Sequence, residues 1–381
     1  MYKRQEYPLA LQGGVSVLVC ELARGLAADF AVTLVSPDRG PDDFPEGLRE
    51  FTEGHVSLEP VASGAGLGAE LRARGVRLAH FHWGGNYTWQ TKYPGRSPIL
   101  GVRRAGIRCL STLHLVVDPM HGLCDPARPS WQRRALLAAA WLSRMHVLAR
   151  SEAEFGVSQH DTALLRHWYA PLARRIEPLY HSRLSETGAG PVRPDSERKN
   201  HVLSVGHVAF RKGQHVLAEA FARLAPRHPS WTLHILGDEL EPACADRIRQ
   251  IAAQPGLGDR IRLEGPSESA RDWMREARIF VQPSLQEALG LALQEALFEG
   301  CACIGTRAGG IPELIRHDQN GVLVAPGDVG EMAAALDRLM NGRAERERLA
   351  AQARPSVIAR GMTRERMIAA HRARYTNLIT Y

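Results

Sequence analysis

Short apolar runs alternate with helical patterns along the second half of this chain. Helical patterns cover, for example, 213–225 and 329–340. Because the apolar runs are continuous, we expect strands buried on both faces, as in a parallel sheet with helices on each side. The predicted strands are 201–206, 232–237, 261–265, 277–283, 302–306 and 321–326.

The first half repeats this alternation less regularly. A helical pattern covers 15–27, and the stretch 185–200 is polar, lacks periodicity and contains glycine and proline, which is typical of a linker. The predicted strands of this half are 31–37, 76–83, 107–114 and 145–150.

We therefore predict two doubly wound, Rossmann-like α/β domains that face a cleft. The N-terminal domain covers 6–184 and the C-terminal domain covers 201–355, with the linker 185–200 between them. Ligands of such sheets bind outside the carboxyl ends of the strands, so the cleft is the expected site.

A glycine pair, Gly13–Gly14, introduces the first helical pattern, but no apolar strand precedes it. "MYKRQ" is polar and basic, and Pro8 lies where a central strand would not tolerate proline. DNA that encodes these residues from a GTG start resembles the end of a transposon adapter used in sequencing libraries. We expect that "MYKRQ" is such an adapter and that the first strand of domain 1 is missing; the alternative is a natural basic N-terminus.

Composition narrows the class of protein. Hydrophobic residues make up 44% of the 381 residues and charged residues 23%, which is ordinary for a globular protein with large cores. The six cysteines are scattered, which favours a cytoplasmic location. The net charge of +7 favours an anionic ligand or an anionic membrane surface. No nucleic-acid recognition module is visible, so no nucleic-acid partner is expected.

The stretch "PSLQEALGLALQEALFEG" (283–300) carries the strongest chemical signal. Glu287 lies in the predicted loop after strand 277–283, and Glu295 lies one turn into the following helix. The start of that helix would attract a phosphate through its N–H groups and dipole. A carboxylate such as Glu295 can accept hydrogen bonds from two adjacent hydroxyls, as on a ribose. The N–H groups at the helix start belong to Ala288, Leu289, Gly290 and Leu291.

Two further stretches point to the same edge of the sheet. "VGHVAFRKG" (205–213) places Arg211 and Lys212 in the loop after the first strand of this half, where they could hold a diphosphate. A later loop adds the turn Gly309–Gly310 and a short helix opened by Pro312. Taken alone, the two glutamates equally fit an ordinary helix with solvated carboxylates, but the combination favours a ligand site.

This set of motifs resembles the retaining glycosyltransferases of family 4, the glycosyl transferases group 1, which have the GT-B fold. The resemblance covers nearly the whole chain and is strongest over 201–340. It implies a nucleotide-sugar donor bound by the second domain. Lys212 matches the family's phosphate-binding lysine, Glu287 the glutamate that faces the donor sugar, and Glu295 the ribose-binding glutamate. It also implies that a final helix, 356–381, returns to the N-terminal domain.

The resemblance assigns residues in the first domain as well. Gly13 and Gly14 match the family's glycine loop beside the diphosphate and the acceptor. His114 matches the histidine that contacts the donor sugar; the alternative is a structural hydrogen bond at the end of a strand. His80 and His82 fall on one face of a strand, and we interpret them as a strand-end feature near the acceptor rather than as metal ligands.

The chain departs from the family pattern at two places within the donor-binding set. His207 stands where the family usually has an arginine, five positions before the lysine, and Arg211 is a candidate substitute. In the loop after Glu287 only Gly290 of the usual Gly-Phe-Gly is kept.

The implied function is a retaining, hexosyltransferase-like glycosyltransferase. It would move a sugar from a nucleotide-diphosphate donor to a hydroxyl acceptor (a glycan, a lipid-linked sugar or a small molecule) in polysaccharide, lipopolysaccharide or glycolipid synthesis for the cell envelope. Lys212, Arg211 and the amides of 288–291 would neutralise the leaving diphosphate, so no metal or other cofactor is expected. The alternatives are a non-catalytic nucleotide-sugar-binding protein and a GT-B sugar-nucleotide epimerase.

The arginine-rich segment 343–374 raises the question of a membrane partner. We expect it to be helical and to pack on the first domain. The alternative is a weak peripheral contact with anionic lipid on the cytoplasmic face of the inner membrane. The packing prediction names Ile358, Met362, Met367, Ile368 and Tyr375.

Overall fold

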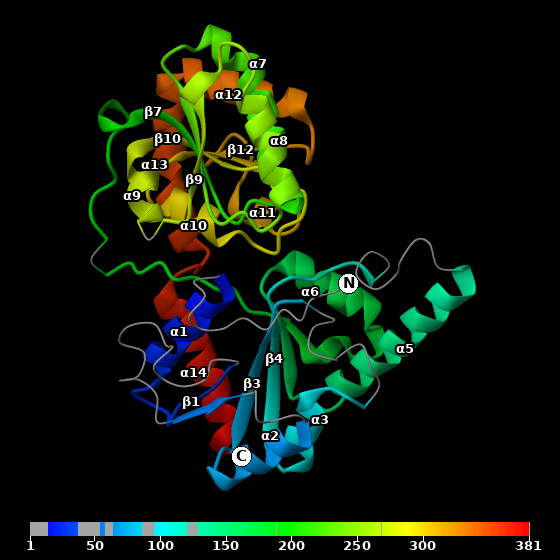
Figure 1. Cartoon of the computed structure of the whole chain (residues 1–381). Helices are drawn as coiled ribbons and strands as arrows, with labels where there is room; N and C mark the ends of the chain where they lie inside the picture. Colours follow the sequence, from blue (N-terminus) through cyan, green and yellow to red (C-terminus); the bar gives the residue numbers. More distant parts are fainter. Residues whose placement is uncertain are drawn as a thin grey trace. The chain divides into compact units, whose positions relative to one another are not determined.

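The computed structural model divides the chain into two compact units. Unit 1 comprises Met1–Arg183 and Arg364–Tyr381, and unit 2 comprises Leu184–Thr363. Figure 1 shows the elements of each unit. The structure describes residues 14–36, 54–57, 64–85, 95–119, 129–187, 189–267 and 269–380.

Unit 2 is built on a six-stranded parallel sheet with the order β12-β11-β10-β7-β8-β9. All six predicted strands are confirmed. Strands β8, β10 and β11 are almost wholly buried, as their continuous apolar runs predict, and β7 is buried over residues 202–204. The bounds are β7 Lys199–Val205, β8 Thr232–Leu236, β9 Ile261–Gly265, β10 Ala277–Gln282, β11 Ala302–Thr306 and β12 Val322–Val324.

Helices cover both faces of this sheet (Figure 1). One layer contains α8, α7 and α12, and the other contains α9, α10 and α13. Local signals fix their ends: the side chain of Asp328 caps α12 by accepting a hydrogen bond from the N–H of Glu331 at 2.9 Å. The bounds are α7 Gln214–Leu224, α8 Pro242–Ala252, α9 Ala270–Glu276, α10 Leu291–Phe298, α11 Ile311–Leu314, α12 Val329–Asn341 and α13 Arg343–Ala359.

The polar stretch predicted as a linker is partly structure of unit 2. Residues Asp195–Glu197 form a 3₁₀ helix, and β7 begins at Lys199. Asp195 is buried and receives two hydrogen bonds from the Arg346 guanidinium, at 2.8 and 2.7 Å. This bidentate ion pair binds the segment to α13. The polar composition of the stretch, which is typical of a linker, gives no sign of this contact.

The described part of unit 1 contains a four-stranded parallel sheet, β3-β4-β5-β6, and a two-stranded parallel pair, β1-β2. With unit 2, this confirms the predicted pair of parallel-sheet α/β domains. The strand predicted over 145–150 is wrong, because these residues form the last turns of a helix and the first residues after it. The bounds are β1 Thr33–Ser36, β2 Gly54–Ser57, β3 Leu78–Trp83, β4 Arg108–Leu113, β5 Ala153–Gly156 and β6 Ile176–Pro178.

The helices of unit 1 include one from the far end of the chain. Helix α14 contacts α1 and β3, as Figure 1 shows. Met367 and Ile368 of α14 are buried, and Tyr375 makes an edge contact with Phe30. Ile358 and Met362, named in the same packing prediction, belong to unit 2. The bounds are α1 Gly14–Leu26, α2 Gly64–Ala73, α3 Pro98–Arg104, α5 Ser130–Leu148, α6 Gln159–Trp168 and α14 Arg364–Thr380.

The prediction of a missing first strand concerns residues 1–13 and whatever precedes them, and these lie outside the described residues. Gly13 falls in the same stretch, whereas Gly14 is the first residue of α1. No helix in the described ranges is both long and apolar enough to cross a membrane.

Candidate functional site

A buried ion pair joins the loops after β7 and β10 in unit 2. The ammonium of Lys212 lies 2.6 Å from Oε2 of Glu287, and the two side chains are 15% and 10% exposed. Lys212 ends the 3₁₀ helix Phe210–Lys212, and Glu287 lies between β10 and α10. Both loops leave the carboxyl ends of neighbouring parallel strands, so residues 75 positions apart in sequence meet at one edge.

Hydrogen bonds from the end of β10 hold the Glu287 carboxylate in place. Ser284 Oγ and Gln282 Nε2 donate to Oε2 of Glu287 at 3.0 and 3.2 Å. Thr306 at the end of β11 donates to the main-chain oxygen of Ser284 at 2.6 Å. Sequence reasoning missed these supporting residues, although Ser284 lies in the stretch 283–300 that carries Glu287.

The environment keeps Glu287 ionised. Burial raises the pKa of the Glu287 carboxyl, but the charges of Lys212 and Arg211 and the hydrogen bonds from Lys212 and Ser284 act against it. The net pKa of Glu287 lies below its usual value. An ionised carboxylate next to an ammonium suits electrostatic work rather than donation of a proton.

Two glycines allow the loops to meet. Gly213 has φ +71°, and a Cβ atom there would lie 1.9 Å from the main-chain oxygen of Pro283. Gly309 has φ +52°, and a Cβ atom there would lie 1.6 Å from the main-chain oxygen of Glu287. Only glycine tolerates both the conformation and the contact, which explains the Lys-Gly and Gly-Gly motifs.

The predicted helix start at the sheet edge is present. Helix α10 begins at Leu291, with Gly290 as its N-cap in the left-handed region at φ +96°. Glu295 is buried on the second turn of this helix, 5% exposed. Ala288 and Leu289 lie in the loop and are also buried. The structure therefore brings the predicted donor-site segment next to the Lys212–Glu287 pair.

Arg211 and His207 lie on the β7 side of the same edge. The main-chain oxygen of Arg211 accepts hydrogen bonds from the N–H groups of Leu285 and Gln286 at 2.8 and 3.2 Å, which fixes this loop to the one after β10. His207 Nδ1 lies 3.6 Å from a carboxylate oxygen of Asp238. Burial lowers the pKa of His207, and the cations Lys212 and Arg211 lower it further against the opposing effect of Asp238.

His114 belongs to a cluster of histidines in unit 1. It follows β4, and its Nε2 lies 3.1 Å from Nδ1 of His82 at the end of β3. The rings of His181 and His371 extend the cluster, at centroid distances of 5.0 Å between His114 and His181 and 5.7 Å between His181 and His371. Burial lowers the pKa of His114 to about 3. His181 follows β6 and His371 lies in α14, so the sequence around His114 does not predict that they join it.

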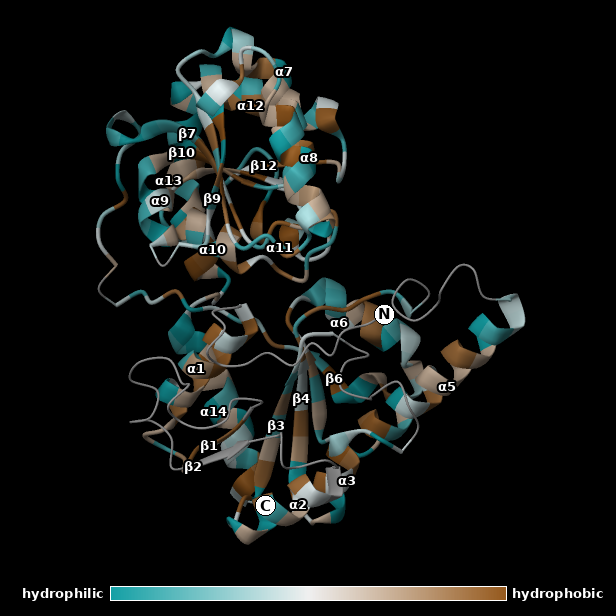
Figure 2. Ribbon diagram, viewed as in Figure 1, coloured by the Kyte–Doolittle hydropathy of each residue, from teal (hydrophilic) through white to brown (hydrophobic). Residues whose placement is uncertain are grey.

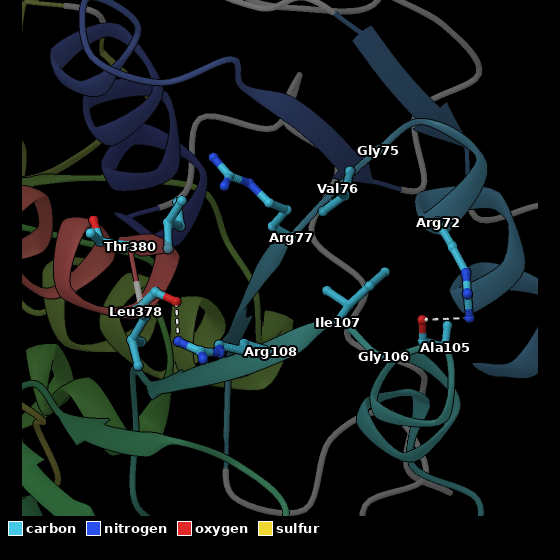
Figure 3. Close-up of a pocket in the computed structure, with 11 residues that line it drawn as sticks. Arg72, Gly75, Val76, Arg77, Ala105, Gly106, Ile107, Arg108, Leu378 and Thr380 are labelled. Atoms are coloured by element: carbon cyan, nitrogen blue, oxygen red, sulfur yellow. Dashed lines mark hydrogen bonds between the residues drawn. The ribbon is translucent and has the colours of Figure 1, made fainter.

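A shallow hollow of about 550 Å³ lies elsewhere in unit 1, at the amino ends of β3 and β4 (Figure 3). Arg77 and Arg108 line it, and Arg108 donates to the main-chain oxygen of Leu378. His82 and His114 lie at the opposite ends of these strands, so the hollow is separate from the histidine cluster. Over the described ranges, no group of three or more His, Cys, Asp or Glu side chains is arranged to hold a metal ion.

Comparison with known proteins places this chain in a family. The family model described as "Glycosyl transferases group 1" matches residues 191–355. The D-inositol 3-phosphate glycosyltransferase of Xylanimonas cellulosilytica is 33% identical over an alignment that covers 90% of this chain and 87% of that protein. The chain belongs to the glycosyl transferases group 1. The prediction that the chain is one of the glycosyl transferases group 1 is thereby confirmed.

Other glycosyltransferases match over shorter regions. The lipopolysaccharide core biosynthesis glycosyltransferase LpsE of Rhizobium meliloti is 31% identical over 157 residues, which cover 41% of this chain and 44% of LpsE. The matched region thus spans less than half of that relative.

Two solved structures share the fold of this group 1 chain. Sucrose-phosphate synthase from Thermosynechococcus elongatus matches with a TM-score of 0.75 at 21% identity, covering 97% of this chain and 94% of that one. HepE from Anabaena, solved with UDP-glucose, matches with a TM-score of 0.72 at 16% identity, covering 98% of each chain. The chain therefore has the GT-B fold, as predicted.

Proposed function

We propose that this protein is a retaining glycosyltransferase that transfers a sugar from a nucleotide-diphosphate donor to a hydroxyl acceptor. The buried Lys212–Glu287 pair, at the carboxyl edge of the unit 2 sheet, is the observation that carries the proposal. It supplies a fixed cation beside the start of α10, where a diphosphate would find both positive charge and main-chain N–H groups.

Lys212 stabilises the charge that develops on the diphosphate as the bond to the sugar breaks. Its ammonium is already positioned and largely shielded from water, so its attraction to the growing charge is strong and needs no rearrangement. Arg211 adds a second positive charge from the adjacent position. Because these cations and the amides of 288–291 do this work, the proposed reaction needs no metal ion.

Glu287 orients the donor sugar, and Glu295 binds the ribose hydroxyls. Glu287 is ionised and acts as a hydrogen-bond acceptor toward the sugar while it holds Lys212 in place. The acceptor hydroxyl attacks from the face that the diphosphate leaves, and the departing phosphate takes its proton. His114 contacts the donor sugar from unit 1.

The comparisons support the donor and pathway class. HepE was solved with UDP-glucose, and LpsE is named for lipopolysaccharide core biosynthesis. We therefore propose a nucleotide-sugar donor and a cell-envelope glycan or glycolipid acceptor. The reported relatives are glycosyltransferases, which favours transfer over sugar-nucleotide epimerisation or non-catalytic binding.

A donor panel tests this proposal. The purified protein is screened against UDP-, GDP- and dTDP-sugars by thermal shift, because a ligand that binds only the folded state raises the melting temperature. Donors that stabilise the protein are then incubated with hydroxyl acceptors, and the product is analysed by mass spectrometry. A glycosylated product that depends on the donor supports the proposal, and stabilisation without any transfer would instead favour a binding protein.

A further inference from the structure

Helix α5 of unit 1 exposes large apolar side chains along its length. Trp131 is 68% exposed, Leu142 58%, Trp141 39% and Leu136 37%. Figure 1 shows that the N-terminal part of α5 extends away from the sheet of unit 1, and Figure 2 shows hydrophobic positions continuing along this part. Contiguous exposed apolar surface of this kind marks a site of interaction.

Apart from Leu136, which lies on the other side, the exposed positions of α5 form one face of the helix. Trp131, Ala135, Ala138 and Leu142 are all exposed and follow one another at intervals of four, three and four residues. This spacing places them in a single stripe along an α-helix. Tryptophan and leucine on one side of a helix are typical of segments that lie in the interface between lipid and water.

The surroundings of this stripe carry positive charge. Residues 130–148 contain no aspartate or glutamate. Arg134, which is exposed, falls between Trp131 and Ala138 on the same side of the helix, and Arg174 is exposed on the 3₁₀ helix Ala170–Arg175 that packs against α5.

The acidic residues that follow α5 do not offset this charge. Glu154 pairs with buried Arg144 at 2.5 Å, and Glu152 pairs with Arg103 at 2.9 Å. Asp161 is only 2% exposed. The net charge of the whole chain is +7.

We propose that α5 is a membrane-binding helix that lays its apolar face on an anionic lipid surface. The apolar stripe would enter the interface while Arg134 reaches the lipid phosphates. A second copy of the chain fits this face less well, because two copies of a helix without acidic residues would bring arginines together.

This assignment also differs from a contact through the C-terminal helix. Three of the four arginines of α14 are engaged within unit 1: Arg364 pairs with Glu21, Arg372 with Asp29, and Arg374 with Glu177. The apolar side chains Met367 and Ile368 of α14 are buried.

Sedimentation with vesicles tests the proposal on the full chain. One set of vesicles is phosphatidylcholine alone, and the other is an equal mixture with phosphatidylglycerol. We expect cosedimentation with the mixed vesicles at low salt, and weaker binding as salt is raised. The double variant Trp131→Ser/Leu142→Ser should lower the partition coefficient at least about tenfold, since both side chains lose their burial in lipid. Arg134→Gln should lower it about fivefold.

Leu240→Ser is the matched control, because Leu240 is 53% exposed but lies in unit 2. It should bind vesicles like the wild type, and circular dichroism should show that all variants are folded. Wild-type protein that stays in the supernatant with mixed vesicles at low salt would overturn the proposal. So would binding that survives the double variant, or a dimer in sedimentation velocity that the double variant abolishes.

Discussion

At the scale of single residues, the proposed chemistry depends on one cation and its partner. Lys212 is held by Glu287 at 2.6 Å, and Glu287 is held in turn by Ser284 and Gln282. This chain of contacts fixes the ammonium before any ligand arrives. Preorganised charge of this kind lowers a reaction barrier because no reorientation is needed as charge develops.

Substitution of Lys212 tests its proposed role. Lys212→Ala should reduce kcat/KM by a factor that corresponds to about 2 to 4 kcal/mol, the usual loss when one donor to a developing anion is removed. Lys199→Ala is the control, because Lys199 lies in the same unit and pairs with Glu276 at the surface. The control should keep the wild-type rate, and a Lys212→Ala enzyme with near-normal turnover would refute the assignment.

Glu295 is expected to act on binding more than on chemistry. Glu295→Ala should weaken donor affinity in calorimetry by about tenfold to a hundredfold, because hydrogen bonds between a charged group and the ribose are lost in ground and transition states alike. The donor affinity of Glu295→Gln, which keeps one acceptor oxygen, should lie between that of the wild type and that of Glu295→Ala. If affinity is unchanged while turnover collapses, the ribose role is wrong.

At the scale of elements, three strand-to-helix loops of unit 2 are locked together. The loop after β7 receives hydrogen bonds from Leu285 and Gln286, and the N–H of Gly310 donates to the main-chain oxygen of Glu287 at 3.3 Å. The loops after β7, β10 and β11 thus form one hydrogen-bonded surface around the ion pair. Catalytic side chains placed on such a surface need little ordering when a ligand binds.

A methyl group at Gly309 should break this arrangement. Gly309→Ala should lower the free energy of unfolding by at least about 2 kcal/mol, since the Cβ atom meets the Glu287 main chain and the positive φ is strained for alanine. Gly190→Ala is the matched control, because a Cβ atom there meets nothing within 4 Å. Urea denaturation of both variants measures the difference, and equal stabilities would contradict the packing described for this loop.

The histidine cluster makes unit 1 sensitive to acid. Burial lowers the pKa of His371 to about 4, and His114 behaves similarly. In the unfolded chain, His371 and His114 are protonated as the pH falls through their ordinary pKa. In the folded unit, both imidazoles stay neutral until the pH reaches their lowered pKa values. The free energy of unfolding is therefore highest above about pH 6.5. It falls as the pH drops toward the pKa values of the folded state, by about 1.4 kcal/mol per pH unit for each such histidine.

Urea denaturation at several pH values checks this expectation. The wild type should lose stability steadily between about pH 6.5 and about pH 4.5, and His371→Gln should flatten the slope. The control is His160→Gln, because His160 is an exposed residue outside the cluster. An identical slope in the wild type and His371→Gln would contradict the role of burial.

How far the sequence predicts these elements depends on local pattern. The strands of unit 2 are readable because their apolar runs are continuous. The sequence does not predict strand β5 because its buried Glu154 is charged, and only the ion pair with Arg144 on the preceding helix makes that burial tolerable. The run at 145–150 was mistaken for a strand because a short apolar segment fits the end of a buried helix equally well. The sequence motifs predict that Lys212 and Glu287 lie at the same edge of the unit 2 sheet. The ion pair between them could not be predicted, because it depends on how the two loops fold.

At the scale of the whole molecule, the chain crosses between its two units twice. It passes into unit 2 at Leu184 and returns to unit 1 at Arg364. Each unit carries its own parallel sheet, with the proposed donor site in unit 2 and the histidine cluster and α5 in unit 1. In the proposal, unit 2 binds the nucleotide sugar and unit 1 meets the acceptor and the lipid surface.

The anomeric configuration of the transferred sugar distinguishes retaining transfer from every other outcome. The protein is incubated with an α-linked nucleotide sugar, chosen from the donors that stabilise it, and with a hydroxyl acceptor, and the product is analysed by proton NMR. A retaining enzyme that uses Lys212 should give an α-linked product that forms only with the donor and is nearly lost in Lys212→Ala. A β-linked product, or the absence of any transfer across the donor panel, would contradict the proposal.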